Sequence, residues 1–393
     1  MDKLEKLKMN HIKSILIVTP DYPIDGEPVY PFVKNLCDEF VRKGCDVTIL
    51  APQSLTSRLR HRKIKRPVVR YDLVGENKVM IYQPYKVSFP YKYQKINNKI
   101  DQLCITHFLR KHSIRPDVCY GHFWRSGFLL LPFVKRNHLP LFVATGEGDL
   151  MKYAPVLTSH AYLEMNKYLS GVISVSSNNR NISQQLGLLE GKDCLVAPNA
   201  IDGSLYYRKD KDSIREKYGL SKEDFIVAFV GAFNNRKGSL RVSEAIDKVG
   251  GVKSFFIGSQ GESELLEPTC EGILYKGRLP HEVIPDYLNM ADIFVLPTLN
   301  EGCCNAIVEA LACGLPIVSS NRPFNYDVLN ETNSIMVNPM NVEEIASAIK
   351  ELKDNQSRRK QLSEGALKTA EDLTIDRRAQ KIINFMEQHI NVR

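Results

Sequence analysis

The sequence predicts an α/β protein with two doubly wound domains, each a parallel sheet covered by helices on both faces. Short apolar segments of strand length alternate with amphipathic segments of helix length along the whole chain, as in successive β-α-β units. The 393 residues suffice for two or three domains, at roughly 150 residues for each. Charge divides the chain as well: residues 1–190 hold 28 Lys and Arg against 16 Asp and Glu, whereas the remainder holds 25 against 29.

The composition excludes several classes of protein. Apolar residues make up 43% and charged residues 25% of the chain, which is typical of a globular protein and not of a disordered or fibrous one. The longest apolar runs, 127–134 and 225–233, are far shorter than the roughly 20 residues that cross a bilayer. The apolar stretch Ile15–Val18 is too short for a secretory signal. We therefore expect a cytoplasmic protein whose nine cysteines, none in a C-x-x-C pair, are reduced and mostly buried.

The first domain is predicted to begin with a strand at 14–19 and a helix at about 30–43. Apolar residues at helical spacing mark the buried face of that helix: Phe32, Val33, Leu36, Phe40 and Val41. Gly44 follows and can adopt the left-handed conformation that ends a helix. Further strands are predicted at 46–52, 118–120, 140–146 and 171–176, separated by segments of helix length.

A second alternation of strands and helices starts after the segment PNAID at 198–202. Strands are predicted at 224–232, 253–258, 272–277, 293–298, 316–320 and 334–338. Asn341 as N-cap and Glu344 three residues later mark a helix at 342–352. We place the first domain at residues 1–195, the second at 196–375, and at 376–393 a C-terminal helix that packs back on the first domain. Doubly wound sheets bind ligands outside the carboxyl ends of their strands, so we expect the site in a cleft between the domains.

The densest basic segment is residues 58–70. It holds seven cations within thirteen residues: Arg58, Arg60, Arg62, Lys63, Lys65, Arg66 and Arg70. One interpretation is a solvated loop, and the other is docking on an anionic membrane at the inner face of the cell, where each nearby cation contributes about 1 kcal/mol. Nucleic acid is not expected as a partner, because the segment lacks interleaved aromatic residues and the chain shows no nucleic-acid-binding motif.

The most informative segment is residues 293–320, in which a strand is followed by Glu301-Gly302 and then by a helix. Four amides at the start of this helix are expected to be unpaired and to attract phosphate, with help from the helix dipole: those of Cys303, Cys304, Asn305 and Ala306. A carboxylate just ahead of such a site suits the hydroxyl groups of a sugar or ribose. Glu301 has that position, and Glu309 lies eight residues further on. The spacing leaves equally open that Glu301 only caps the helix.

These two glutamates form an E-x7-E pair, and the sequence continues as A-x-x-x-G-x-P-(V/I)-(V/I). The combination resembles the retaining glycosyltransferases of family 4, also called glycosyl transferases group 1, of the bacterial polysaccharide type. Other segments resemble the same family over nearly the whole chain: VRKGCDVTILAP at 41–52, PDVCYGHFW at 116–124, PNAID at 198–202, FVGAFNNRKGS at 229–239 and YLNMADIFVLPTLNEG at 287–302. The resemblance implies the GT-B fold, two Rossmann-like domains that face each other across a cleft.

The resemblance also implies a role for each matching residue. Lys237 would neutralise the donor diphosphate, together with the glycine loop at Gly231. Glu301 and the amides of Cys303, Cys304 and Asn305 would hold the donor sugar, and Glu309 would hold the ribose hydroxyls. His122 would hydrogen-bond the sugar and the charge that develops on it, and the alternative for this residue is a buried structural histidine.

Three positions depart from the family pattern. The usual Arg after the first glycine of the phosphate loop is Ala232 here, and Arg236 is the neighbouring residue that could replace it. The T-x-H-G segment of the family reads Thr145-Gly146-Glu147-Gly148, which places Glu147 in the acceptor or sugar pocket. The glycine-rich loop of the first domain retains Gly26 alone, so a backbone approach to phosphate is expected at that residue.

The resemblance implies a retaining, metal-independent transfer of sugar from a nucleotide-diphosphate sugar to a hydroxyl of a glycan or lipid-linked oligosaccharide, in polysaccharide biosynthesis. A UDP- or GDP-sugar is the expected co-substrate, with no other cofactor. No G-x-G-x-x-G or G-K-[ST] occurs, which disfavours a dehydrogenase or an NTPase. Two alternatives stay open: an epimerase of the same fold, and a protein that binds nucleotide sugars without transferring them, which Ala232 suggests.

Overall fold

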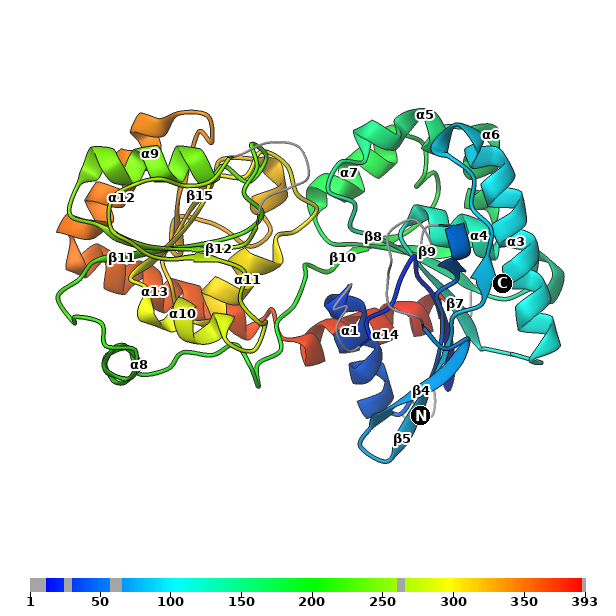
Figure 1. Ribbon diagram of the computed structural model, residues 1–393. Coiled ribbons are helices and arrows are strands. Elements are labelled where there is room, and N and C mark those ends of the chain that lie inside the picture. The colour runs from blue at the N-terminus through cyan, green and yellow to red at the C-terminus, as the bar shows by residue number, and fades with distance from the viewer. Residues whose placement is uncertain (1–11, 25–29, 57–65, 260–265, 391–393) are drawn as a thin grey trace, which may run out of the picture. The chain divides into compact units, whose positions relative to one another are not determined.

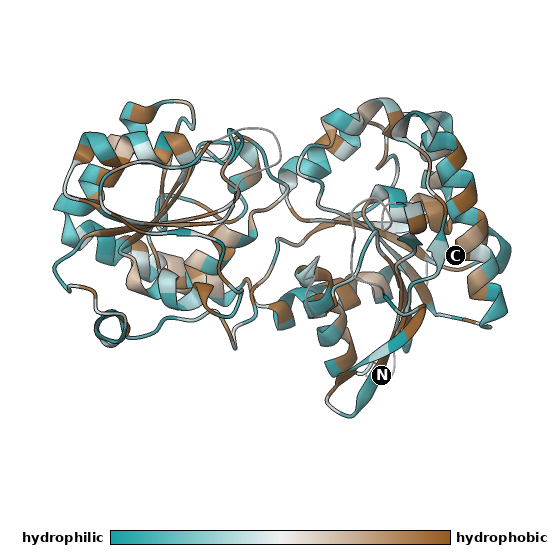
Figure 2. Ribbon diagram, viewed as in Figure 1, coloured by the Kyte–Doolittle hydropathy of each residue, from teal (hydrophilic) through white to brown (hydrophobic). Residues whose placement is uncertain are grey.

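The computed structural model describes residues 12–24, 30–56, 66–259 and 266–390 (Figure 1). Contacts divide these residues into two compact units. Unit 1 contains the described residues up to Ala197 together with those from Asp376 onward, and unit 2 is Pro198–Ile375. Each unit is built on its own sheet of largely parallel strands, and hydrophobic residues concentrate along those strands (Figure 2). The predicted α/β class with two doubly wound domains is confirmed.

Unit 1 contains an eight-stranded sheet with the order β10-β9-β8-β7-β1-β2-β5-β4. Neighbouring strands are parallel except for β4 and β5, which are antiparallel. The strands are β1 (Ser14–Val18), β2 (Asp46–Leu50), β4 (Val69–Val74), β5 (Asn77–Tyr82), β7 (Val118–His122), β8 (Leu141–Thr145), β9 (Leu169–Ser174) and β10 (Cys194–Val196). A short parallel pair is separate from this sheet and consists of β3 (Gln53–Ser54) and β6 (Tyr85–Lys86).

The helices of unit 1 are α1 (Pro31–Arg42), α3 (Gln94–Lys111), α4 (Trp124–Asn137), α5 (Ala154–Leu157), α6 (His160–Met165), α7 (Ser177–Gln185) and α14 (Ile375–Ile390). Proline suits the first position of a helix, and Pro31 begins α1. The helix buries Val33, Leu36, Phe40 and Val41 as the spacing predicts, whereas Phe32 is only half-buried. Gly44 follows with φ of +89°, in the left-handed region expected there.

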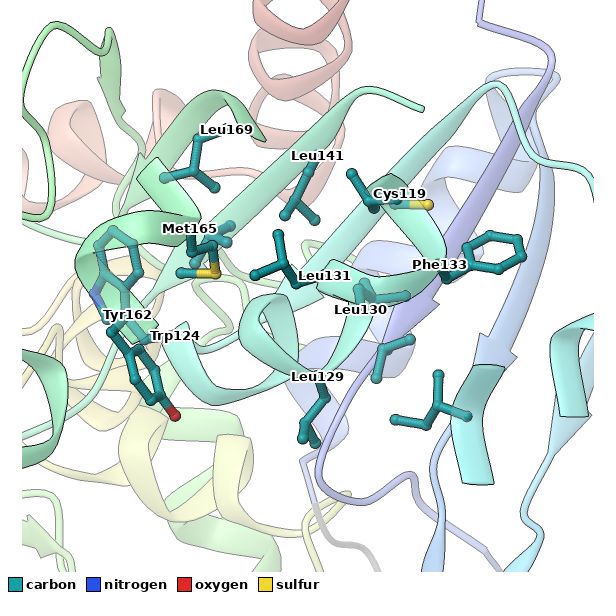
Figure 3. Close-up of a cluster of buried hydrophobic side chains, with 14 of the residues drawn as sticks. Cys119, Trp124, Leu129, Leu130, Leu131, Phe133, Leu141, Tyr162, Met165 and Leu169 are labelled. Atoms are coloured by element: carbon teal, nitrogen blue, oxygen red, sulfur yellow. The ribbon is translucent and has the colours of Figure 1, made fainter. Parts of the chain in front are cut away.

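The main hydrophobic cluster of unit 1 joins α4 to the central strands (Figure 3). Strands β7 and β8 are buried at every position, because helices cover both faces of a parallel sheet. Trp124, the first residue of α4, is buried in the cluster with Leu130 and Leu141. The carboxyl end of β7 therefore lies beside this hydrophobic cluster.

Helix α14 packs against unit 1, although it is the last described element of the chain. The ring of Phe385 lies so close to Gly171 of β9 that a Cβ at this glycine would be 2.7 Å from it. Glu387 accepts a hydrogen bond from the amide of Ile12 at 3.3 Å. Nε2 of His389 lies 2.8 Å from a carboxylate oxygen of Asp193.

Unit 2 contains a six-stranded parallel sheet with the order β13-β12-β11-β14-β15-β16. Its strands are β11 (Ile226–Val230), β12 (Lys253–Ile257), β13 (Ile273–Gly277), β14 (Ile293–Leu296), β15 (Ile317–Ser320) and β16 (Ser334–Val337). Its helices are α8 (Lys211–Lys217), α9 (Ser239–Val249), α10 (Ile284–Met290), α11 (Asn305–Ala312), α12 (Val342–Asp354) and α13 (Gln356–Glu371). The strand order reverses between β11 and β14, which is where doubly wound sheets bind ligands.

The side chain of Asn341 caps α12 as predicted. Its amide oxygen accepts hydrogen bonds from the backbone N–H groups of Glu343 at 3.1 Å and Glu344 at 3.3 Å. Asp210 has the same role for α8 and accepts from the amide of Ser213 at 2.7 Å. The nine cysteines are free, and seven of them are buried, as their composition and spacing predict.

The basic segment 58–70 is only partly a surface feature. Arg66 is 4% exposed and forms an ion pair with Asp21. Arg70 pairs with Asp72 and donates a hydrogen bond to the carbonyl of Pro23 at 2.5 Å. The prediction that all seven cations face solvent or a membrane is therefore wrong for these two, because carboxylates from β4 and from the loop after β1 neutralise them. Arg58, Arg60, Arg62, Lys63 and Lys65 lie outside the described residues.

Candidate active site

Two neighbouring strands of unit 2 bring the predicted donor-binding residues together. Strand β11 leads through Gly231 into the loop that carries Arg236 and Lys237, and β14 leads into the loop that carries Glu301. Because β11 and β14 are parallel neighbours, both loops leave the same edge of the sheet. Helix α11 begins at Asn305 on this edge, with Cys304 as its N-cap residue.

Lys237 and Arg236 both contact Glu301. The ammonium Nζ of Lys237 lies 2.7 Å from Oε1 of Glu301, and Nη1 of Arg236 lies 2.5 Å from the same oxygen. The buried hydroxyl of Thr298 donates to it as well, at 2.8 Å. Among the described residues, no hydrogen bond or ion pair reaches Oε2, so this oxygen can accept from a ligand. The two cations and one carboxylate leave a net positive charge at the start of α11.

The Lys237 side chain is held in place along its whole length. Its Cγ and Cδ atoms pack over Gly231, where an added Cβ would lie 3.4 Å from them. Burial lowers the pKa of the Lys237 ammonium, but its contacts with Cys304 and with the Glu301 carboxylate outweigh this effect and raise it. The ammonium therefore stays charged and can neutralise an anion.

Cys304 lies between Lys237 and the helix. Its Sγ accepts a hydrogen bond from Nζ of Lys237 at 3.7 Å. Burial raises the pKa of the Cys304 thiol, although Lys237 and the amides of Ile307 and Ala306 favour the thiolate. The thiol is therefore neutral, and it places little negative charge where a phosphate would bind.

Asn199 of the PNAID segment connects this segment to the start of α11. Its amide nitrogen donates to the carbonyl of Cys303 at 2.9 Å and to Oδ1 of Asn305 at 2.7 Å. The sequence marked the PNAID segment as a linker and did not predict this contact. The hydrogen bonds fix the loop 303–305, whose amides are the predicted phosphate ligands.

Glu309 lies in α11 beside two residues that the sequence analysis did not identify. Its Oε1 lies 3.7 Å from Nε2 of His281, and the Tyr206 hydroxyl lies 3.0 Å from the same ring nitrogen. Contact with the Glu309 carboxylate raises the pKa of His281, and burial raises that of Tyr206. His281 follows strand β13, and a polar residue between a strand and the next helix was the signal that could have identified it.

His122 ends β7 of unit 1 in an aromatic environment. Its ring lies 4.5 Å from that of Phe123 and 5.6 Å from that of Phe32, measured between centroids. Burial and the charge of Arg378 lower the pKa of His122 to about 3, so the imidazole is neutral. Its Nδ1 is buried and has no hydrogen-bond partner in the part of the chain that the structure describes. Such a nitrogen can be satisfied by a ligand hydroxyl.

The backbone directly after His122 is strained. Phe123 has φ of 75° and ψ of 154°, a region that is otherwise almost reserved for glycine and costs about 1–3 kcal/mol. Strain of this kind concentrates at ligand sites. Backbone strain at Phe123 is expected if His122 acts at a ligand site, and a purely structural histidine does not require it.

The side chain of Glu147 accepts hydrogen bonds from residues of unit 1. Its Oε1 accepts from the amide of Trp124 at 3.0 Å, at the start of α4. Its Oε2 accepts from the hydroxyl of Thr145 at 2.8 Å and from the amide of Gly146 at 2.9 Å. Burial raises the pKa of Glu147, although these hydrogen bonds act in the opposite direction. The structure thus gives Glu147 a positioning role next to His122, and a direct contact with sugar stays a prediction.

Gly26 lies outside the described residues. No group of three or more His, Cys, Asp or Glu side chains that could hold a metal ion occurs among residues 12–24, 30–56, 66–259 and 266–390. The positive charge at the unit 2 site comes from Lys237, Arg236 and the helix terminus.

The chain is similar to known glycosyltransferases. The family model of glycosyl transferases group 1 matches residues 210–369, which lie in unit 2. The chain is 24% identical over 347 residues to the putative teichuronic acid biosynthesis glycosyltransferase TuaC of Bacillus subtilis, covering 85% of this chain and 88% of that protein. It is 24% identical over 260 residues to UDP-Gal:alpha-D-GlcNAc-diphosphoundecaprenol alpha-1,3-galactosyltransferase of Escherichia coli, covering 61% and 67% of the two chains.

Solved structures share the fold over nearly the whole length. Sucrose-phosphate synthase from Thermosynechococcus elongatus superposes with a TM-score of 0.77 at 15% identity, over 96% of this chain and 98% of that chain. HepE of Anabaena in complex with UDP superposes with a TM-score of 0.72, also at 15% identity, over 96% and 100%. The fold is therefore GT-B, as the resemblance implied.

Proposed function

We propose that this protein is a retaining glycosyltransferase that moves a sugar from a nucleotide-diphosphate sugar to a hydroxyl of a glycan or lipid-linked acceptor in polysaccharide assembly. Glycosyltransferase activity of group 1 is supported by the family match over residues 210–369 and by the relatives TuaC and the Escherichia coli galactosyltransferase. The names of these relatives mention teichuronic acid and diphosphoundecaprenol, which suggests polysaccharide substrates. A solved structure of the same fold binds UDP, and UDP is accordingly the first nucleotide to test.

One observation carries the proposal. The cluster of Lys237, Arg236 and Glu301 lies at the N-terminus of α11 with a net positive charge, and a carboxylate oxygen in the middle of it is available to hydroxyl groups. Binding of a diphosphate requires the positive charge, and binding of a sugar requires an acceptor for its hydroxyl groups. Preorganised positive charge at a leaving group is commonly the largest contribution to catalysis.

Each residue then has a distinct part in the reaction. Lys237 and Arg236 stabilise negative charge on the departing diphosphate, and Glu301 Oε2 accepts from the hydroxyls of the donor sugar. Glu309 accepts from the ribose. His122, neutral and without an internal partner at Nδ1, donates to or accepts from the sugar without competing for a proton at neutral pH. We place no metal ion in this sequence of events.

A thermal-shift series with UDP, GDP and their sugars tests the proposal. A ligand that binds only the folded protein stabilises it by RT ln(1 + [L]/Kd), about 2.7 kcal/mol at one hundred times Kd. We expect a rise in Tm with one nucleotide class and formation of the transferred product once an acceptor is supplied. Absence of stabilisation by every nucleoside diphosphate would contradict the proposal. Binding without transfer to any acceptor would favour a binding protein, and sugar rearrangement without an acceptor would favour an epimerase.

Metal independence is a second expectation. Lys237 and Arg236 supply the positive charge that a divalent cation supplies in metal-dependent transferases. Activity in an excess of EDTA should therefore remain within about twofold of the untreated rate, a change too small to reflect loss of catalytic charge. A rate that falls to background in EDTA and returns with Mn²⁺ or Mg²⁺ would show this reasoning to be wrong.

We also propose that unit 1 docks peripherally on anionic membranes. None of the described helices is long and apolar enough to cross a bilayer. Instead, α3 carries Lys95, Lys99, Arg110 and Lys111, and its one carboxylate, Asp101, is buried. On the same solvent face Ile96 is 49% and Leu103 71% exposed. A helix face that combines cations with exposed apolar side chains is typical of an interfacial helix.

Vesicle flotation tests this surface. The variant Lys95→Gln/Lys99→Gln/Arg110→Gln should reduce partition onto anionic vesicles at low salt about 100-fold, because each cation contributes about 1 kcal/mol near such a surface. A matched unit 2 variant, Lys217→Gln/Lys222→Gln/Lys350→Gln, should leave partition unchanged. If the wild-type protein does not bind anionic vesicles at low salt, or if both variants behave alike, α3 is an ordinary solvated helix.

A further inference from the structure

Unit 1 contains a pocket that none of the predicted site residues lines. It encloses about 230 Å³ and lies beyond the carboxyl ends of β1 and β2, next to the first turn of α4. This is the ligand-binding edge of a doubly wound sheet. The volume is below the roughly 300–1,000 Å³ of a drug-sized site, so the pocket suits one small group and not a whole nucleotide.

Cations from three separate segments line this pocket: Arg66, Lys86 and Arg125. Arg66 is neutralised by Asp21, which also lines the pocket. Lys86 and Arg125 share one carboxylate, because Nζ of Lys86 lies 2.7 Å and Nη2 of Arg125 lies 2.5 Å from the same Oδ2 atom of Asp101. Asp101 carries one negative charge against two positive charges. Counted over the described residues, the pocket therefore keeps a surplus of one positive charge.

The two cations are held firmly and at different depths. Asp101 is buried, and the side chain of Lys86 is 13% exposed whereas that of Arg125 is 34% exposed. Nε of Arg125 also donates to Asn98 at 3.2 Å, so the contacts to Asn98 and Asp101 employ two of the five donors of a guanidinium. A fixed guanidinium at the mouth of a pocket is well suited to an oxyanion.

Exposed apolar side chains lie beside the pocket. Along 85–89 the side chains alternate: Lys86 and Ser88 line the pocket, whereas Tyr85, Val87 and Phe89 are exposed. Together with the hydroxyl of Ser126, these residues give the pocket hydrogen-bond donors beside an apolar rim. An anionic group attached to a larger molecule can enter it.

We propose that this pocket binds an anionic group, a phosphate or carboxylate, on the acceptor, and that Arg125 and Lys86 thereby select acceptors that carry such a group. The inference rests on the proposed glycosyltransferase function and adds the charge of its acceptor. A phosphate would belong to a glycan linked through phosphate, and a carboxylate would belong to an acidic sugar. Both offer the oxyanion that the surplus charge requires.

Calorimetry on the full chain, saturated with UDP to occupy the proposed donor site, tests the pocket. The probes are glucose 1-phosphate, glucuronic acid and glucose, so the first two distinguish phosphate from carboxylate and the third is the neutral control. We expect at least one anionic sugar to bind ten times or more tightly than glucose. Arg125→Gln and Lys86→Met should each remove most of that preference. Lys135→Met, whose cation pairs with Glu164 at 3.2 Å on another part of α4, should keep it.

The outcomes distinguish failure of the anion site from failure of the proposed glycosyltransferase function. Equal affinity for all three sugars, or an anion preference that both pocket variants retain, would overturn the anion site while UDP binding leaves the proposed function intact. Failure of UDP and GDP to bind the wild-type protein would instead remove the proposed function. Arg125→Gln is the primary variant because its partly exposed side chain can be removed without opening a core. Unchanged UDP affinity in each variant checks that the chain is folded.

Discussion

Replacing Lys237 with Met is expected to lower kcat about 100- to 1,000-fold, the effect of removing one preorganised charge from a transition state. Met keeps the aliphatic stem that packs over Gly231 and removes only the ammonium. Glu301 retains Arg236 and Thr298 as partners, so the fold should persist. The loss should lie in kcat more than in donor KM, because the diphosphate gains charge on leaving. Initial rates with the donor identified by thermal shift measure both constants.

Lys209→Met is the matched control for this experiment. Lys209 also belongs to unit 2 and also forms an ion pair, with Asp286 at 2.7 Å, but it lies before α8 and away from the loops that follow β11 and β14. Its replacement should leave kcat close to that of the wild type. A near-native kcat in Lys237→Met would exclude Lys237 from the reaction, and an equal fall in both variants would indicate a general loss of stability.

Replacing Glu309 with Gln is expected to weaken UDP binding by about 1.5–3 kcal/mol, the usual contribution of hydrogen bonds to a charged acceptor, or roughly 10- to 150-fold in Kd. The substitution preserves the shape of the side chain beside His281 and Tyr206 and removes its charge. If Glu309 holds the ribose, pyrophosphate binding should not change, since this probe has no ribose. Calorimetry with UDP and with pyrophosphate measures the two effects separately.

Glu244→Gln, on the exposed side of α9, is the control and should leave both affinities unchanged. Lys237→Met should show the reverse selectivity and weaken pyrophosphate. Unaltered UDP affinity in Glu309→Gln would remove this residue from the donor site. An equal loss for UDP and pyrophosphate would mean that the substitution disturbs α11 as a whole.

The strand and helix pattern could be read along the chain because it depends on neighbouring residues. The spacing of Val33, Leu36 and Phe40 and the cap at Asn341 predicted their helices correctly, since burial periodicity and capping act over a few residues. The antiparallel hairpin of β4 and β5 was not predicted. Its strands carry exposed apolar residues such as Tyr71 and Leu73. The basic segment before them was interpreted as a loop or a membrane contact, so no strand was predicted there.

The motifs identified which residues could carry the chemistry, and the sheet topology brought them into contact. Lys237 and Glu301 are 64 positions apart, yet they meet because β11 and β14 are neighbours. No local pattern could show that Arg236 points toward Glu301. The same holds for His281 and Tyr206 beside Glu309, which come from separate elements.

The charges of unit 1 show most clearly what the sequence alone does not determine. Composition established that this half of the chain is basic, but it counted Arg66 and Arg70 with the cations that were available to a partner. Folding pairs them with Asp21 and Asp72 and gathers Lys86 and Arg125 around the single buried carboxylate of Asp101. Chain composition thus determines how much charge a domain carries. Which charges are neutralised depends on contacts between residues that are distant in sequence, and these exist only after the strands have paired.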